Sequence, residues 1–81
     1  MVDKLFLKAK RAWYENGKIC ILLSDNREVR LPIYQNEKLR KASLEQVSNI
    51  EIISNGTGLH WPDLDEDLSV VGILEGRFGK I

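Results

Sequence analysis

The segment from His60 to Asp67 holds the densest group of chemically capable side chains in the sequence: one histidine, one tryptophan and four carboxylates. His60 beside Asp63 or Asp65 has the composition of a general acid/base pair, which needs two titratable groups with separated pKa values. The same groups are also potential metal ligands. Their spacing fits neither a calcium loop nor a zinc set, since the single Cys20 lies forty residues away. The plainer interpretation is a solvated acidic loop beside a structural histidine, with no metal site.

A nucleophile would have to come from one cysteine or a few serines outside any known motif. Cys20 lies in an apolar strand sequence, where burial raises the pKa of a thiol and makes it inert. Ser24, Ser54 and Ser69 stand in no recognisable nucleophile elbow. A glycine-rich phosphate loop followed by a helical lysine is also missing from the sequence. We therefore expect no catalytic residues, no cofactor and no enzymatic activity.

Trp61 has two competing interpretations. Flanked by His60 and Pro62 and rimmed by acids, it has the composition of a binding hot spot. A chain this short also needs its few large aromatic side chains for packing, so Trp61 could equally be a core anchor. On the first interpretation, the predicted partner-binding residues are His60, Trp61, Asp63, Asp65, Glu66 and Asp67.

A basic cluster near the start of the chain suggests an alternative partner. Lys8, Lys10 and Arg11 lie beside Trp13 and Tyr14, and a basic strand next to aromatic rings can stack nucleic-acid bases. The sequence shows no helix-turn-helix, zinc-finger or RNP pattern, and its net charge is zero. A solvated strand face, with Trp13 turned towards the core, is the plainer interpretation.

Length and composition indicate one small globular domain spanning residues 1–81, with 43% hydrophobic and 30% charged residues. A domain of this size buries only about 60% of its unfolded surface, so a bound protein partner or a homo-oligomer is expected. One cysteine, no signal peptide and no apolar run long enough to span a bilayer predict a cytoplasmic protein without a membrane partner.

Charge is divided unevenly along the chain. Residues 1–41 hold ten bases and five acids, whereas residues 42–81 hold two bases and seven acids. The halves therefore carry +5 and −5. Either the halves neutralise each other within the fold, or a basic face and an acidic face point apart and steer a charged partner.

The first half predicts a three-stranded antiparallel meander. Asn16-Gly17 is a strong hairpin signal between strands at 9–15 and 18–24. The second strand is apolar on both faces, so we expect it at the centre of the sheet. Asp25-Asn26 turns the chain into a third strand, which Pro32 ends or confines to an edge.

The second half predicts short helices and a second hairpin. We expect a helix over residues 35–42, with Leu44 and Val47 of a following capped turn facing the core. Ser43 and Gln46 have the spacing of a capping box for that turn. The second half of the chain also predicts strands at 50–54 and 59–61, an acidic loop at 63–67, and a helix from Ser69 to Leu74 with Gly76 at C′. The fold class is thus α+β, with a β-meander, a β-hairpin and two or three short helices.

The order of several motifs resembles a known family. Leu31-Pro32-Ile33 is followed by Ile50-Glu51-Ile52, then by the run from Leu59 to Val70, and then by Gly72-Ile73-Leu74 and Gly76-Arg77. The Trp-Pro-x-Leu-Asp-Glu-Asp-Leu-Ser stretch is the most specific part. Over residues 9–77 the chain resembles the prokaryotic domain-of-unknown-function family numbered 2442.

This resemblance implies a small α+β fold and no established enzymatic activity. Members are often encoded beside another small protein, in pairs of the toxin–antitoxin kind, and some precede a helix-turn-helix that does not follow Ile81 here. Asn36-Glu37-Lys38 also replaces the family's frequent aromatic-proline pair. Together with the charge pattern, the resemblance predicts a cytoplasmic protein-interaction module, antitoxin-like, whose acidic segment docks on a basic partner. The alternatives are a nucleic-acid-associated regulator and a small enzyme centred on His60.

Overall fold

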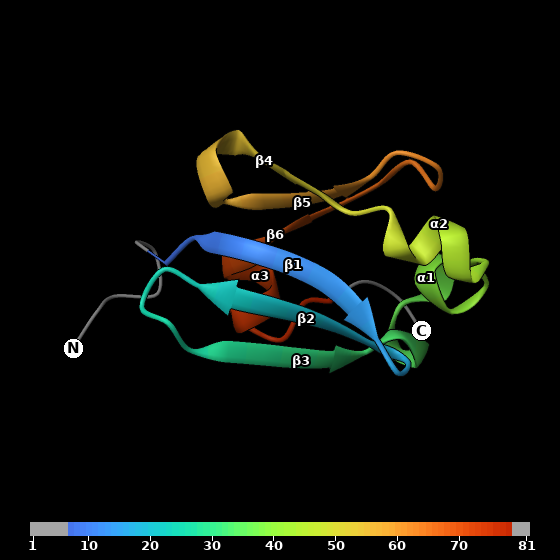
Figure 1. The fold of residues 1–81 in the computed structure, drawn as a ribbon, viewed down its shortest axis with the longest axis horizontal. Helices are drawn as coiled ribbons and strands as arrows, with labels where there is room; N and C mark the ends of the chain where they lie inside the picture. The colour runs from blue at the N-terminus through green and yellow to red at the C-terminus, as the bar shows by residue number, and fades with distance from the viewer. Residues whose placement is uncertain (1–6, 79–81) are drawn as a thin grey trace.

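A meander of three antiparallel strands forms the first sheet. The computed structural model describes residues 7–78 and places β1 (Ala9–Glu15), β2 (Lys18–Leu23) and β3 (Glu28–Pro32) in the order β1-β2-β3 (Figure 1). The β1–β2 turn has positive φ at Asn16 and Gly17, as the sequence predicts. Strand β2 lies at the centre of the sheet, as expected; Ile19, Ile21 and Leu23 are buried on its inner face, while on its outer face Cys20 is buried and Leu22 is half-buried.

The second sheet has one strand more than the predicted hairpin. It contains β4 (Glu51–Ile53), β5 (Gly58–Trp61) and β6 (Glu66–Ser69) in the order β4-β5-β6. The expected acidic loop is therefore shorter, because Glu66 and Asp67 belong to β6. This strand forms because Leu68 pairs with Leu59 and turns inwards while its polar neighbours face outwards.

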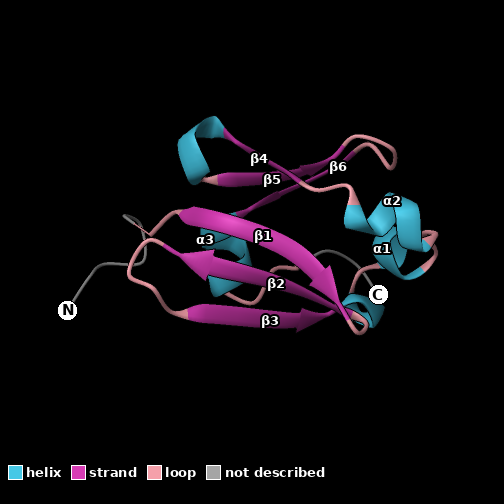
Figure 2. Cartoon of the chain, in the orientation of Figure 1, coloured by secondary structure: helices cyan, strands magenta, loops and turns pink. Residues whose placement is uncertain are grey.

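Short helices connect and close the two sheets. They are η2 (Ile33–Gln35), α1 (Glu37–Arg40), α2 (Leu44–Ser48), η3 (Ser54–Gly56) and α3 (Val70–Leu74). Figure 2 shows α1 and α2 together at one end of the first sheet and α3 behind that sheet. The arrangement is the α+β class that the sequence predicts, with two three-stranded antiparallel sheets.

The helix caps follow the sequence signals closely. Ser43 and Gln46 form the predicted capping box of α2. The Ser69 hydroxyl accepts the backbone N–H of Gly72 at 2.8 Å and caps α3, and Gly76 follows its end with φ +92°. One expectation for α2 is wrong: Leu44 is 69% exposed, because only one position of so short a helix reaches the core.

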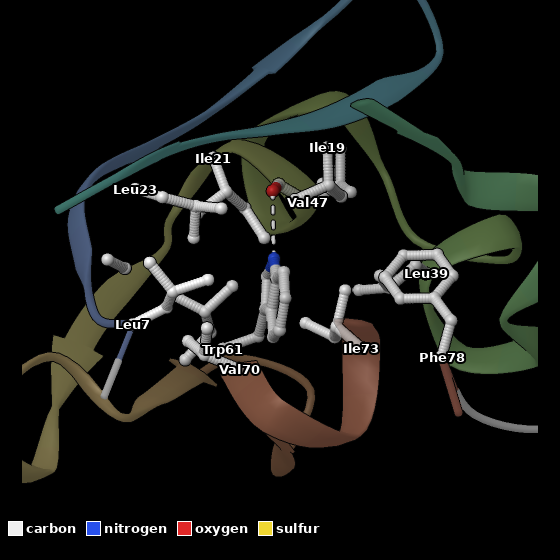
Figure 3. Close-up of a cluster of buried hydrophobic side chains, with 12 residues drawn as sticks. Leu7, Ile19, Ile21, Leu23, Leu39, Val47, Trp61, Val70, Ile73 and Phe78 are labelled. Atoms are coloured by element: carbon white, nitrogen blue, oxygen red, sulfur yellow. Dashed lines mark hydrogen bonds between the residues drawn. The ribbon is translucent and has the colours of Figure 1, made fainter. Parts of the chain in front are cut away.

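The core lies between the inner face of the first sheet, the inner face of the second sheet and α3. Figure 3 shows Ile19 and Ile21 of β2 turned towards Trp61, with Val70 and Ile73 of α3 beside them. Alternation along β2 sends these isoleucines inwards and leaves Cys20 on the opposite face. Among the described residues, no helix is long and apolar enough to cross a membrane.

Candidate functional site

Trp61 lies in the core and not on the surface. Its side chain is fully buried, and its Nε1 donates a hydrogen bond to the Val47 carbonyl oxygen at 3.1 Å (Figure 3). Alternation along β5 places it on the same inner face as Leu59. The structure thus corrects the interpretation of Trp61 as an exposed hot spot, because another protein cannot reach an indole without solvent exposure.

Glu66 is held inside the fold by Asn36, which precedes α1, and by Lys38, which lies in α1. Its carboxylate accepts a hydrogen bond from the Asn36 amide at 2.9 Å and lies 3.9 Å from Lys38 Nζ. The Glu66 side chain is 17% exposed. The buried Asn36 also donates to the Phe78 carbonyl at 2.7 Å and accepts the backbone N–H of Leu39 at 3.1 Å. Glu66 therefore ties β6 to α1 and offers little carboxylate surface to a partner.

His60 and Asp67 face each other across β5 and β6 on the outer face of the second sheet. His60 Nδ1 and Asp67 Oδ1 form a hydrogen bond, so the histidine's carboxylate neighbour is Asp67 and neither Asp63 nor Asp65. The register also places exposed Glu51 of β4 opposite His60. Sequence reasoning missed Glu51, although the register of the second hairpin was a signal that could have found it.

Asp63 and Asp65 occupy the turn between β5 and β6. Both side chains are exposed. An Asp63 carboxylate oxygen accepts a hydrogen bond from the Asn49 amide at 3.1 Å, and the Asp65 carbonyl accepts one from Lys38 Nζ at 3.0 Å. Asp65 has φ 51°, a left-handed conformation that aspartate and asparagine tolerate better than most residues. The turn therefore adds two exposed carboxylates at the end of the strands that carry His60 and Asp67.

Few ion pairs involve these carboxylates, although Lys38 Nζ lies beside Asp65. Within the described part of the chain, none of Glu51, Asp63 and Asp65 belongs to an ion pair, and Asp67 pairs only with His60. We call this set the acidic surface: Glu51, His60, Asp63, Asp65 and Asp67.

The two oppositely charged halves of the chain hardly neutralise each other through ion pairs. Among residues 7–78, Lys38–Glu66 is the one ion pair that joins a base of the first half to an acid of the second. The others lie within one half, as Arg27–Asp25 and Arg77–Glu75 do. Close ion pairing between the two halves is therefore limited to the one contact of Lys38 with Glu66 among the described residues.

The basic cluster at the start of β1 is divided by a bulge. The register shifts between Ala9 and Arg11, and Lys10 Nζ reaches across to the Asn26 side-chain oxygen at 2.9 Å. Arg11 lies over the Trp13 ring, 5.2 Å from its centroid. Lys8, Lys10 and Arg11 are all exposed.

Trp13 is turned away from the core, contrary to the plainer interpretation of the sequence. It is half-buried and pairs with Cys20 across β1 and β2, on the face opposite Ile19 and Ile21. Its neighbour Tyr14 packs against the core instead. Two consecutive strand residues point to opposite faces, so one of these two rings had to lie outside.

The remaining candidates for chemistry are the Cys20 thiol and the potential metal ligands. Cys20 is fully buried, and its burial raises the pKa of the thiol, so little reactive thiolate forms. Among residues 7–78, no three histidine, cysteine, aspartate or glutamate side chains lie close enough together to hold a metal ion.

Fold and site together define a small α+β domain with two antiparallel three-stranded sheets and one carboxylate-rich outer face. The family model described as "Protein of unknown function (DUF2442)" matches residues 9–79, and the chain belongs to that family. No curated protein matches the chain.

Two solved structures are similar to this fold. A crystal structure of a protein of unknown function from Rhodospirillum rubrum is 33% identical, with a TM-score of 0.83, and the match covers 91% of this chain and 92% of that one. A solution NMR structure of an uncharacterised protein from Chromobacterium violaceum is 32% identical, with a TM-score of 0.77 and coverage of 90% and 69%.

Proposed function

We propose that this chain is a protein-interaction module whose acidic surface binds a small basic protein. The observation that carries the proposal is the set of exposed carboxylates at Glu51, Asp63 and Asp65, which belong to no ion pair within residues 7–78; the nearest cation, Lys38, contacts the carbonyl oxygen of Asp65. Carboxylates gathered on one face repel each other and make the local electrostatic potential more negative, so docking of a basic surface there is favourable. Such a partner would be encoded beside this chain and neutralised by it, in the manner of an antitoxin.

The docking surface we propose differs from the set that the sequence predicts. It keeps His60, Asp63, Asp65 and Asp67 and gains Glu51 on the neighbouring strand. It leaves out the buried Trp61 and the tethered Glu66. Because the exposed charges dominate this surface, we expect fast, salt-sensitive association.

The test compares capture by the wild-type chain with capture by a variant neutralised at three positions. Asp63→Asn, Asp65→Asn and Asp67→Asn remove charge but keep the side-chain shape. Each exposed charge pair contributes about 0.2–1 kcal/mol, so the triple variant should bind a basic partner about tenfold more weakly. The control is Asp25→Asn, which removes a half-buried carboxylate, paired with Arg27, from the β2–β3 turn of the first sheet.

Tagged wild-type, triple and control chains are incubated with host lysate, and captured proteins are quantified by mass spectrometry. We expect one basic protein, close to equimolar with the wild-type and control chains and depleted on the triple variant. Equal capture of every protein by all three chains would refute the role of the acidic surface. Far-ultraviolet circular dichroism establishes that the triple variant is folded.

A further inference from the structure

We propose that the outer face of the first sheet binds a second copy of this chain, in a symmetric dimer with the two sheets face to face. This inference uses a different surface from the acidic surface and does not rest on the proposed function. It starts from the position of Trp13, which the fold leaves on the face turned away from the core.

The outer face of the first sheet is open and carries residues typical of interfaces. In Figure 1, α3 lies behind the sheet, and no element of residues 7–78 lies in front of it. Trp13 and Leu22 are half-buried on this face and do not belong to the side chains that pack against the core. Tryptophan and arginine are the residue types most enriched in interface hot spots, and Arg11 covers the Trp13 ring.

Trp13 is held ready for contact by its neighbours. Its Nε1 donates a hydrogen bond to Glu15 Oε1 at 3.0 Å, and Arg11 lies over the ring at 5.2 Å. Arg30 of β3 lies 3.7 Å from Glu15 and 3.3 Å from Glu28. An aromatic ring already fixed in place loses little conformational entropy on binding, so it suits a contact surface.

Two of the three rows that cross this face are complementary to themselves; the third row, Glu15, Lys18, Pro32, has a lysine at its middle position. One row across the sheet runs Arg11, Leu22, Glu28 from β1 to β3, and the next row runs Trp13, Cys20, Arg30. A twofold axis parallel to β2, midway between two such sheets, would place β1 of one copy over β3 of the other.

In that arrangement each row of one copy lies over the same row of the second copy, with the residues in reverse order. Arg11 would face Glu28 of the second copy, and Glu28 would face Arg11. In the next row Trp13 would face Arg30, a cation–π pair made twice. Along the axis Leu22 would meet Leu22 and Cys20 would meet Cys20, which puts apolar contacts in the middle of the interface, while Lys18 would meet Lys18 at its end. Aligned packing of two sheets about 10 Å apart is a common arrangement, so the geometry needs no rearrangement of the backbone.

The alternation of charge disfavours a nucleic acid on the same face. Glu15 and Glu28 lie among the cations Arg11, Lys18 and Arg30, and phosphates laid along the sheet would meet both carboxylates. Matched opposite charges in fixed rows suit a second protein surface with the reverse order, which a second copy of this chain supplies.

The test uses charge reversal with complementation by mixing. Sedimentation velocity over a range of concentrations should show the wild-type chain passing from 9.3 kDa monomer to a species of twice that mass. Arg11→Glu alone and Glu28→Arg alone each place two pairs of like charges across the axis, so each should dimerise at least tenfold more weakly. Trp13→Ala should weaken the dimer similarly.

An equimolar mixture of the Arg11→Glu and Glu28→Arg chains is the decisive sample. In the mixed dimer both cross-interface pairs again carry opposite charges, so dimers should reappear although neither variant dimerises well alone. Glu45→Arg, a charge reversal at an exposed position of α2 outside both proposed surfaces, is the control and should leave the dimer unchanged. A monomeric wild-type chain, failure of the mixture to recover dimers, or wild-type chain that shifts a labelled oligonucleotide at low salt while remaining monomeric would each overturn the proposal.

Discussion

Replacing Asn36 should cost far more stability than its size suggests. Its side chain makes three hydrogen bonds: to the Glu66 carboxylate at 2.9 Å, to the Phe78 carbonyl at 2.7 Å and from the Leu39 N–H at 3.1 Å. Asn36 is 1% exposed, so water cannot replace these partners without opening the fold.

The magnitude for Asn36→Ala follows from the three contacts. Loss of the N-cap bond costs about 1 kcal/mol, and loss of the bond to a carboxylate costs about 1.5–3 kcal/mol. The Phe78 carbonyl lies near the end of the described chain, so we add about 0.5 kcal/mol for it. A total of about 3–4.5 kcal/mol is a large share of the free energy of unfolding of a domain of this length, which is roughly 4–12 kcal/mol.

Urea unfolding followed by circular dichroism measures this loss, and Asn49→Ala is the matched control. Asn49 also donates to a carboxylate, that of Asp63 at 3.1 Å, but on the exposed surface. Its replacement should cost less than about 0.5 kcal/mol. If both variants lose the same free energy of unfolding, the account of Asn36 as a buried junction is wrong.

A charged replacement at the same position gives a pH signature. Asn36→Asp removes both donated bonds and sets a second carboxylate against Glu66, so each carboxylate disfavours ionisation of the other. The variant should be weakest at neutral pH, where both groups are ionised. Its deficit relative to wild type should shrink as pH falls through about 5, because one proton relieves the repulsion.

Further predictions concern three other positions of the fold: Trp61, Gly56 and Cys20. Trp61→Ala should destabilise the domain by about 3–5 kcal/mol and broaden or abolish its thermal transition, whereas a surface tryptophan would leave the transition intact. Gly56→Ala should cost clearly more than Gly17→Ala: both have positive φ, but a Cβ at Gly56 meets Lys8 Cβ at 2.9 Å, while Gly17 has open space. The Cys20 thiol should react with a thiol reagent at least a hundredfold more slowly in the native state than in denaturant, because burial raises its pKa and blocks access. Because the Cys20 thiol ionises at lower pH in the unfolded chain than in the folded one, the free energy of unfolding should fall as pH rises past about 8.5. Cys20→Ala should remove that part of the fall. Equal slopes of the free energy of unfolding against pH for the wild-type and Cys20→Ala chains would contradict this expectation.

Local signals predicted much of the fold because turns and caps depend on a few neighbouring residues. Asn16-Gly17 marked the first hairpin, and Ser43 and Ser69 marked two helix starts. Strand β6 was missed because Glu66 and Asp67 are acids, and acids are depleted in strands. Its formation depends on partners brought by the rest of the fold, which composition does not reveal.

The candidate site was harder to predict because it depends on which way each strand faces. Trp61 and Trp13 were both ambiguous in the sequence, and the structure turns the first inwards and the second outwards. The bulge after Ala9 sets the phase of β1, and no residue type announces it. The helix expected over residues 35–42 includes Asn36, whereas the structure makes Asn36 the N-cap of α1, and its reach to Glu66 thirty residues away depends on the tertiary fold.

The central claim, that the acidic surface binds a basic protein, is tested most directly by titration calorimetry. The purified partner is titrated into the wild-type chain, the Asp63→Asn, Asp65→Asn, Asp67→Asn variant and the Asp25→Asn control, at about 50 and about 300 mM salt. We predict that wild type and control bind equally and weaken as salt rises. The triple variant should bind about tenfold more weakly at low salt, with a smaller dependence on salt. Equal affinity of all three chains, or affinity that salt does not change, would contradict the account.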